Sequence, residues 1–271
     1  MSLRFEQSSL RVDRQDPPWK VVRAFPNPDG GLLLHLHNVS GGVLAGDRLA
    51  LNIDVAAGAV AQVTTTGAGR LYRHRAGVVD SEQRTRISVG EGAILEYLPD
   101  AVIPYAGARH VQSTEVRLNS GAALFWWEIL APGRQAAGEK FAFDRLRFEN
   151  RVFSGTHLVL LENFAVEPAA RSPRSVARLG PYAWVSSFCI CQEGRPPAFW
   201  RDLEDHLNNL ASQLTRPAEA IWGASMLARD GIVVRGLSAT GRFLHPALLD
   251  FWRAARWILT GKPAIPPRKV Y

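Results

Sequence analysis

The chain has 271 residues, 46% hydrophobic and 21% charged, so it holds enough apolar material for a core and is not compositionally disordered. Its net charge of +7 favours acidic partners, but scarce lysine and singly scattered arginines argue against nucleic-acid binding. No apolar run reaches the roughly 20 residues of a membrane span, and the N-terminus lacks a signal peptide's apolar core. We therefore expect a soluble cytoplasmic protein with reduced cysteines.

The first 47 residues contain three strand-like pieces and a glycine-rich loop. The pieces cover 3–12, 19–25 and 32–37, and prolines separate them. His35 and His37 lie on one face of the third piece, but two histidines alone do not make a metal site. The loop 40–47 is typical of a tight turn. Its acidic residue, Asp47, either belongs to an ordinary turn or faces a pocket or channel.

Between residues 49 and 127 the chain repeats one pattern three times: an alternating strand, a glycine-alanine turn and a second apolar strand. A fainter fourth copy covers 150–155 and is followed by the apolar run 158–161. A period of roughly 30 residues predicts a stack of strand-turn-strand units that bury their apolar faces against one another. A β-sandwich of hairpins would give the same local pattern, so these residues do not decide between the two. Either arrangement is mainly β. The three turns are Gly58-Ala59, Gly92-Ala93 and Gly121-Ala122.

Two acidic residues end apolar runs at corresponding positions of the third and fourth copies. Glu128 follows Gly121 by seven residues, and Glu162 follows Gly155 by seven. If the copies are equivalent, the two carboxylates are near neighbours. Burying a carboxylate is costly unless it is paired, hydrogen-bonded or bound to a cation. One interpretation is therefore a structural pair with an arginine, for which the candidates are Arg134, Arg145 and Arg151. The other is an acidic lining for an internal passage, with Glu96 and Asp47 as further candidates.

The C-terminal third contains the two predicted helices. Apolar residues at spacings of three and four predict a helix over 197–215, and a second follows over 246–260. Between them, 221–227 and 232–237 predict a β-hairpin. We expect a single domain over 1–271. It has a β-rich part (1–195), a helix-hairpin-helix part (196–261) and an extended, proline-rich tail (262–271) that is either a packed strap or a docking segment.

Cys189 and Cys191 lie on one face of a predicted strand that precedes the first helix. A Cys-x-Cys pair is a possible ligand pair for a soft metal. Flanked by Phe188 and Ile190, however, the two thiols fit the commoner case of buried, inert cysteines.

Motifs along nearly the whole chain, taken together and in order, resemble the urease accessory protein UreD family, called UreH in some bacteria. One departure is that family members commonly carry tryptophan shortly after the final Pro-Arg, where this chain has Val270-Tyr271. The matching motifs are Gly41-Gly42 with Gly46-Asp47, Gly67-Ala68 with Tyr72, Leu95-Glu96-Tyr97-Leu98-Pro99, Gly133-Arg134 with Gly138-Glu139 and Phe141, Leu259-Thr260-Gly261-Lys262-Pro263, and Pro267-Arg268.

The resemblance implies a mainly β, solenoid-like stack with two helices, and a non-enzymatic role in urease maturation. It implies a hetero-oligomeric complex with apo-urease and with UreF, which recruits the GTPase UreG. Nickel would cross this protein along an internal polar path. Family acids implicated in that path match Asp47, Glu128 and Glu162, with Glu96 a weaker candidate. In the tail, Arg268 and Tyr271 are candidates for partner binding.

We expect no tightly bound cofactor, only transient Ni²⁺, because carboxylates hold nickel more loosely than thiolate or imidazole and a conduit needs weak sites. Two alternatives remain open at this point. One is a hydrolase that uses Glu128 and Glu162 as a carboxylate pair. The other is an interaction scaffold in which the acids are purely structural.

Overall fold

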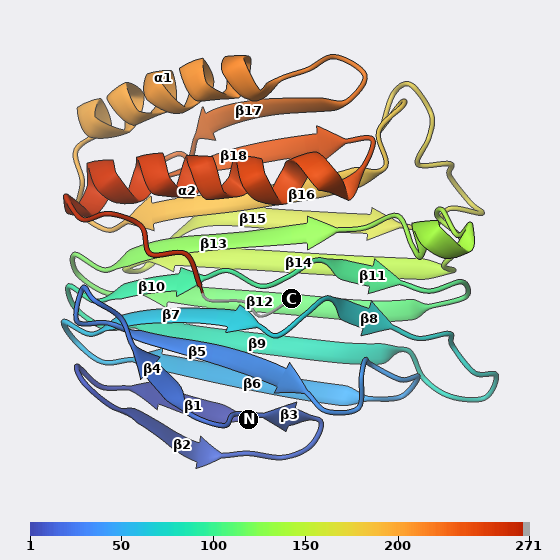
Figure 1. Cartoon of the computed structure of the whole chain (residues 1–271), viewed down its shortest axis with the longest axis horizontal. Helices are drawn as coiled ribbons and strands as arrows, with labels where there is room; N and C mark the ends of the chain where they lie inside the picture. Colours follow the sequence, from blue (N-terminus) through green and yellow to red (C-terminus); the bar gives the residue numbers. More distant parts are fainter. Residues whose placement is uncertain (268–271) are drawn as a thin grey trace.

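The computed structural model describes residues 1–267 and confirms a mainly β chain, with two α-helices in the described part (Figure 1). A seven-stranded sheet faces an eleven-stranded sheet, and the helices cover the outer face of the larger one. None of the described helices has the length and apolar character that crossing a bilayer requires.

The small sheet has the strand order β15 (His157–Val166), β14 (Arg145–Ser154), β12 (Arg109–Leu118), β9 (Ser81–Val89), β6 (Arg48–Val55), β1 (Ser2–Phe5) and β2 (Leu10–Arg14). The large sheet has the order β17 (Ala220–Met226), β18 (Gly231–Ser238), β16 (Trp184–Gln192), β13 (Ala123–Leu130), β10 (Ile94–Tyr97), β7 (Val60–Thr65), β5 (Leu32–Asn38) and β3 (Trp19–Lys20). Three short strands complete it: β4 (Ala24–Pro26), β8 (Gly69–Leu71) and β11 (Val102–Pro104).

The three clear repeats stack on one another in parallel. The first strands of the units, β6, β9 and β12, are parallel neighbours in the small sheet, so that Ile53 lies opposite Ile87 and Ile87 opposite Val116. The second strands, β7, β10 and β13, are parallel neighbours in the large sheet. Each glycine-alanine turn therefore carries the chain from one sheet to the other. All three turn glycines have positive φ, and the alanines that follow them are buried.

The fourth copy does not repeat this path. After β14 the two-residue turn Gly155-Thr156 returns the chain antiparallel, so that β15 pairs with β14 in the same sheet. Thr156 is exposed where the other turns have a buried alanine. The prediction that Glu128 and Glu162 occupy equivalent positions was therefore wrong: Glu128 lies in the large sheet and Glu162 at the edge of the small one.

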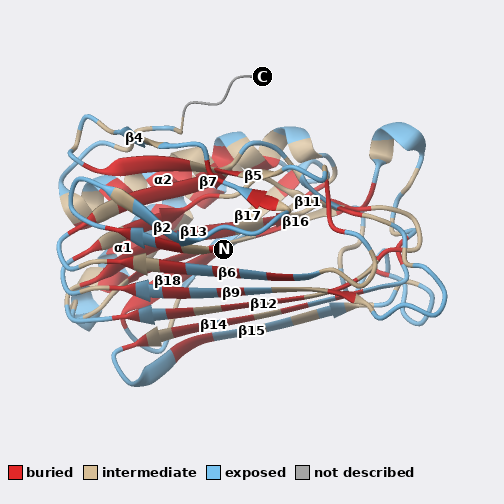
Figure 2. Cartoon of the chain, turned by 90° about the horizontal axis from the view of Figure 1, so that it is seen from below, coloured by how far each residue is buried: buried red, intermediate tan, exposed pale blue. Residues whose placement is uncertain are grey.

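The main core lies between the two sheets. Along the strands of the small sheet, buried and exposed residues alternate, so one face is apolar and the other meets solvent (Figure 2). The large sheet is also covered on its outer face along β13, β16, β18 and β17, where α1 (Pro197–Leu214) and α2 (Leu244–Thr260) pack. Trp127 of β13, for example, packs edge-to-face against Trp252 of α2.

The predicted C-terminal elements are present with small shifts at their ends. Helix α1 begins at the expected residue, whereas α2 begins two residues early, at Leu244. Gly261, with a φ of 66°, ends α2 in the left-handed conformation expected of a glycine stop. Strands β17 and β18 form the predicted hairpin. Two short 3₁₀ helices, Gln135–Ala137 and Gly241–Phe243, lie in connecting segments.

Candidate functional site

A cavity of about 980 Å³ lies between the two sheets. Its walls take one to four residues from each of many strands: β9, β12, β14 and β15 on one side, and strands from β5 to β17 on the other. The cavity therefore crosses the strands and follows the direction in which the units stack. Neighbouring strands lie ~4.8 Å apart, so the six steps from β5 to β17 in the large sheet correspond to roughly 30 Å.

Glu128 is one of the two glutamates that line this cavity. On β13 it has the same inward orientation as Leu124 and Trp126, and therefore faces the small sheet. Two amides of that sheet hold its carboxylate: Gln112 Nε2 donates to Oε1 at 2.6 Å, and Asn150 Nδ2 donates to Oε2 at 2.5 Å. Burial raises the pKa of Glu128 to about 7, the Asn150 bond opposes this shift, and the charge of Glu162 adds to it.

Glu162, on β15, is the second glutamate of the cavity wall. Its Oε1 accepts hydrogen bonds from Arg235 Nη2 at 2.7 Å and Nε at 3.2 Å. The Ser187 hydroxyl lies 3.1 Å from both carboxylate oxygens. The expected structural partners were wrong, because each pairs with another acid: Arg134 with Glu139, Arg145 with Asp80, and Arg151 with Glu149.

Strand register brings these groups together. Asn150 lies opposite Glu162 in the small sheet, and Glu128 lies opposite Ser187 in the large one. The bonds from Asn150 to Glu128 and from Ser187 to Glu162 then cross between the sheets. The two acids thus lie close together despite their different positions in the fold.

The sequence patterns did not predict four polar side chains that bind the two glutamates: Gln112, Asn150, Ser187 and Arg235. Two of them, Gln112 and Asn150, could have been found, because every second residue of β12 and β14 faces inward and these polar residues occupy inward positions. The other two, Ser187 and Arg235, come from β16 and β18, whose pairing with the repeat strands no local pattern indicates.

Comparison with known proteins identifies the family. The family model described as UreD urease accessory protein matches residues 1–271. The chain belongs to this family. Among its curated relatives, the urease accessory protein UreD of Herpetosiphon aurantiacus is 38% identical over 100% of this chain and 94% of its own length. UreD of Dechloromonas aromatica is 41% identical over 97% of this chain and 89% of its own length. UreD of Cenarchaeum symbiosum is 33% identical over 96% and 91%, respectively. The family resemblance is therefore confirmed.

In this UreD family member, Asp47 is not among the residues that line the cavity. Its Oδ2 accepts a hydrogen bond from the Leu44 amide at 2.8 Å and closes the glycine-rich loop. The start of the same loop, Gly41 and Gly42, does border the cavity. The Asp47 carboxylate thus has the role expected in an ordinary turn, while Gly41 and Gly42 of the same loop form part of the cavity wall. A place for Asp47 on a nickel path remains a prediction.

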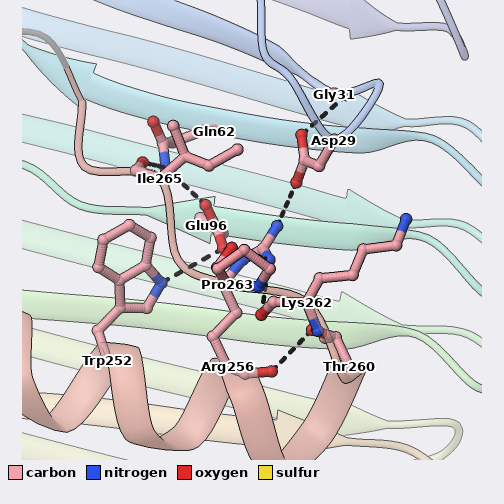
Figure 3. A network of polar contacts seen from close by, with 10 residues as sticks. All are labelled: Asp29, Gly31, Gln62, Glu96, Trp252, Arg256, Thr260, Lys262, Pro263 and Ile265. Carbon is pink, nitrogen blue, oxygen red and sulfur yellow. Dashed lines mark hydrogen bonds and ion pairs between the residues drawn. The ribbon is translucent and has the colours of Figure 1, made fainter.

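Glu96 points to the opposite face of the large sheet of this UreD chain, toward the helices (Figure 3). It is 1% exposed and accepts hydrogen bonds from Arg256 Nε at 2.5 Å, Gln62 Nε2 at 2.6 Å and Trp252 Nε1 at 3.3 Å. Burial raises the pKa of Glu96, and Arg256 opposes that shift. Arg256 also pairs with Asp29, so these groups form a buried ionic network separate from the cavity.

The same network holds the tail. Arg256 Nη1 donates to the Pro263 carbonyl at 2.6 Å, and Gln62 Nε2 donates to the Ile265 carbonyl at 2.9 Å (Figure 3). These hydrogen bonds hold residues 262–265 beside Glu96, as the strap interpretation of the tail expects. The two tail residues predicted to bind partners, Arg268 and Tyr271, lie outside the described part of the chain.

The histidines and cysteines that raised the question of a metal lie off the cavity wall. His35 packs edge-to-face on Phe25, and Cys189 and Cys191 are buried with their sulfurs 3.4 Å apart. Within residues 1–267, no group of three or more His, Cys, Asp or Glu side chains is arranged to hold a metal ion.

Proposed function

We propose that this UreD family member is a non-enzymatic urease maturation factor whose internal cavity passes nickel toward the urease active site. In this proposal the protein binds apo-urease and UreF and, through UreF, the GTPase UreG, in a hetero-oligomeric cytoplasmic complex. Family membership supports the role in urease maturation. The nickel path and the binding of UreF and UreG go beyond what family membership supports, and they are proposed here.

The single observation that carries the nickel path is the cavity lined by Glu128 and Glu162 along the stacking direction. A cavity of about 980 Å³ has room for many water molecules, each of which takes about 30 Å³ in the liquid. A cation inside it can therefore keep part of its hydration shell.

The chemistry of the wall suits passage better than storage. Among the described residues of the wall, the polar side chains are carboxylates, amides, hydroxyls, arginines and the indoles of two tryptophans, with no histidine or cysteine. Nickel binds oxygen ligands more weakly than imidazole or thiolate. Weak successive sites allow an ion to enter and leave, whereas a tight site would trap it.

The test is urease activation by a reconstituted complex that carries Glu128→Gln and Glu162→Gln together. We expect the variant to co-purify with apo-urease and UreF as the wild type does, and the nickel content of urease and its activity to fall. A matched control replaces Glu115 and Glu149, two outward-facing acids of the small sheet, with glutamine. Normal nickel delivery by the cavity variant would refute the path.

The same variant separates the proposal from its two rivals. If the acids are purely structural, the variant loses its fold or its partners, which a melting curve and the co-purification detect. If the protein is a hydrolase, the variant loses turnover of a glycoside substrate that the wild type cleaves, and nickel transfer is unaffected.

A further inference from the structure

Arg235 forms an ion pair with Glu162, one of the two glutamates that line the cavity. We propose that the guanidinium of Arg235 is a resident counter-ion in a divalent-cation site formed by Glu162, Glu128 and the side-chain oxygen of Asn150, and that an arriving cation displaces it. This inference rests on the proposed function and adds a residue that sets how tightly the cavity holds its cargo.

The contacts of the two glutamates are unequal. Glu162 has a full positive charge beside it, because both bonds from Arg235 reach its Oε1. Among the described residues, Glu128 accepts hydrogen bonds only from the neutral amides of Gln112 and Asn150. The carboxyl group of Glu128 therefore has hydrogen-bond donors but no cationic partner within residues 1–267. A divalent cation between the acids would neutralise both, which Arg235 alone does not.

A second observation independently points to a ligand at this place. Asn150 is 3% exposed and lines the cavity, and its amide nitrogen donates a hydrogen bond to Glu128. Its Oδ1 is buried and has no hydrogen-bond partner in the described part of the chain. A buried acceptor without a partner costs about 1–3 kcal/mol. A cation or its water shell would supply the missing partner, and amide oxygens are ligands for hard cations.

Arg235 is also able to leave. Its side chain is 57% exposed, whereas that of Glu162 is 18% exposed. An exposed ion pair contributes little to stability, typically about 0–1 kcal/mol, so releasing the guanidinium into water costs little. When the cation moves on, Arg235 can return to Glu162. This exchange keeps the site from holding nickel tightly, as a conduit requires.

The test is calorimetric titration of the full-length chain with Ni²⁺. We expect Arg235→Gln to bind Ni²⁺ roughly tenfold more tightly than the wild type, because the competing positive charge is gone. Arg235→Lys keeps the charge and should bind like the wild type. Adding Glu162→Gln to Arg235→Gln should abolish the gain.

The control is Arg253→Gln, which removes an exposed arginine paired with Asp250 on α2, outside the cavity wall, and should leave binding unchanged. Thermal unfolding checks that every variant is folded. Equal or weaker binding by folded Arg235→Gln overturns the inference. A gain that survives the added Glu162→Gln also overturns it, because the competition would then lie elsewhere.

This result is distinguishable from failure of the proposed function. If Arg235→Gln tightens binding but Glu128→Gln with Glu162→Gln leaves urease activation normal, the cation site stands and the delivery path does not. If activation falls in that double variant while Arg235→Gln leaves binding unchanged, the path stands and the counter-ion inference falls.

Discussion

Replacing Arg256 with methionine would remove the positive charge that lies between the carboxylates of Glu96 and Asp29. The side chain of Arg256 is 1% exposed and those of its partners are 2% and 8% exposed, so water cannot take its place. Removing one member of a buried ion pair typically costs about 3–5 kcal/mol. We expect a loss of about 4 kcal/mol in the free energy of unfolding at pH 8, since two acids and the Pro263 carbonyl lose a donor.

The loss should depend on pH. Burial already raises the pKa of Glu96, and without Arg256 that pKa rises further. A carboxyl whose pKa is higher in the folded state favours folding below its unfolded-state pKa, and this contribution disappears as the pH rises through the folded-state value. The variant should therefore be closest to the wild type at acidic pH and furthest from it at alkaline pH.

The assay is urea unfolding followed by tryptophan fluorescence, because Trp252 contacts Glu96. Two comparisons sharpen it. Arg253→Met, on the same helix, breaks an exposed pair and should cost less than about 1 kcal/mol. Adding Glu96→Gln to Arg256→Met should recover part of the loss, because one stranded charge is removed. A loss below about 1 kcal/mol for Arg256→Met, or no recovery in the double variant, would show that Arg256 does not neutralise the two buried acids.

Two further predictions concern the strands around the cavity. Burial raises the folded-state pKa of Glu128 from its ordinary 4.5 to about 7, so its contribution to stability is full below pH 4.5 and is lost as the pH rises through 7. Unfolding of Glu128→Gln should lack this decline, which amounts to about 3 kcal/mol by pH 8, and an identical pH profile would contradict it. In the C-terminal hairpin, a Cβ on Gly236 would lie 2.3 Å from a tryptophan ring, whereas one on Gly223 meets nothing within 4 Å. Gly236→Ala should therefore cost about 1–3 kcal/mol in urea unfolding and Gly223→Ala much less; equal costs would contradict the packing.

Local patterns predicted the repeat and its inward residues because each unit has the same short-range constraints. A left-handed glycine followed by a buried alanine, as at Gly92-Ala93, both shapes the turn and directs the chain to the other sheet. The fourth copy lacks that alanine. Thr156 stands in its place, and this difference was the available signal that the chain would turn back as a hairpin.

The partners of the acids could not be predicted in the same way. Glu96 and Arg256 are 160 residues apart, and the contact exists only because α2 packs on the large sheet. Arg235 reaches Glu162 from a strand 73 residues later in the chain. Nothing in the periodicity of either strand indicates which carboxylate a distant arginine will meet, so the nearer arginines in sequence were the wrong candidates.

Because the units stack in parallel, the length and the width of the cavity depend on different features of the chain. Each additional coil would add one strand to each wall and lengthen the cavity by one strand spacing, ~4.8 Å, without changing its width. The width depends instead on the volumes of inward side chains such as Gln112 and Asn150. The length and the width of the cavity can therefore change independently. The number of coils sets its length, and single substitutions of inward side chains change its width.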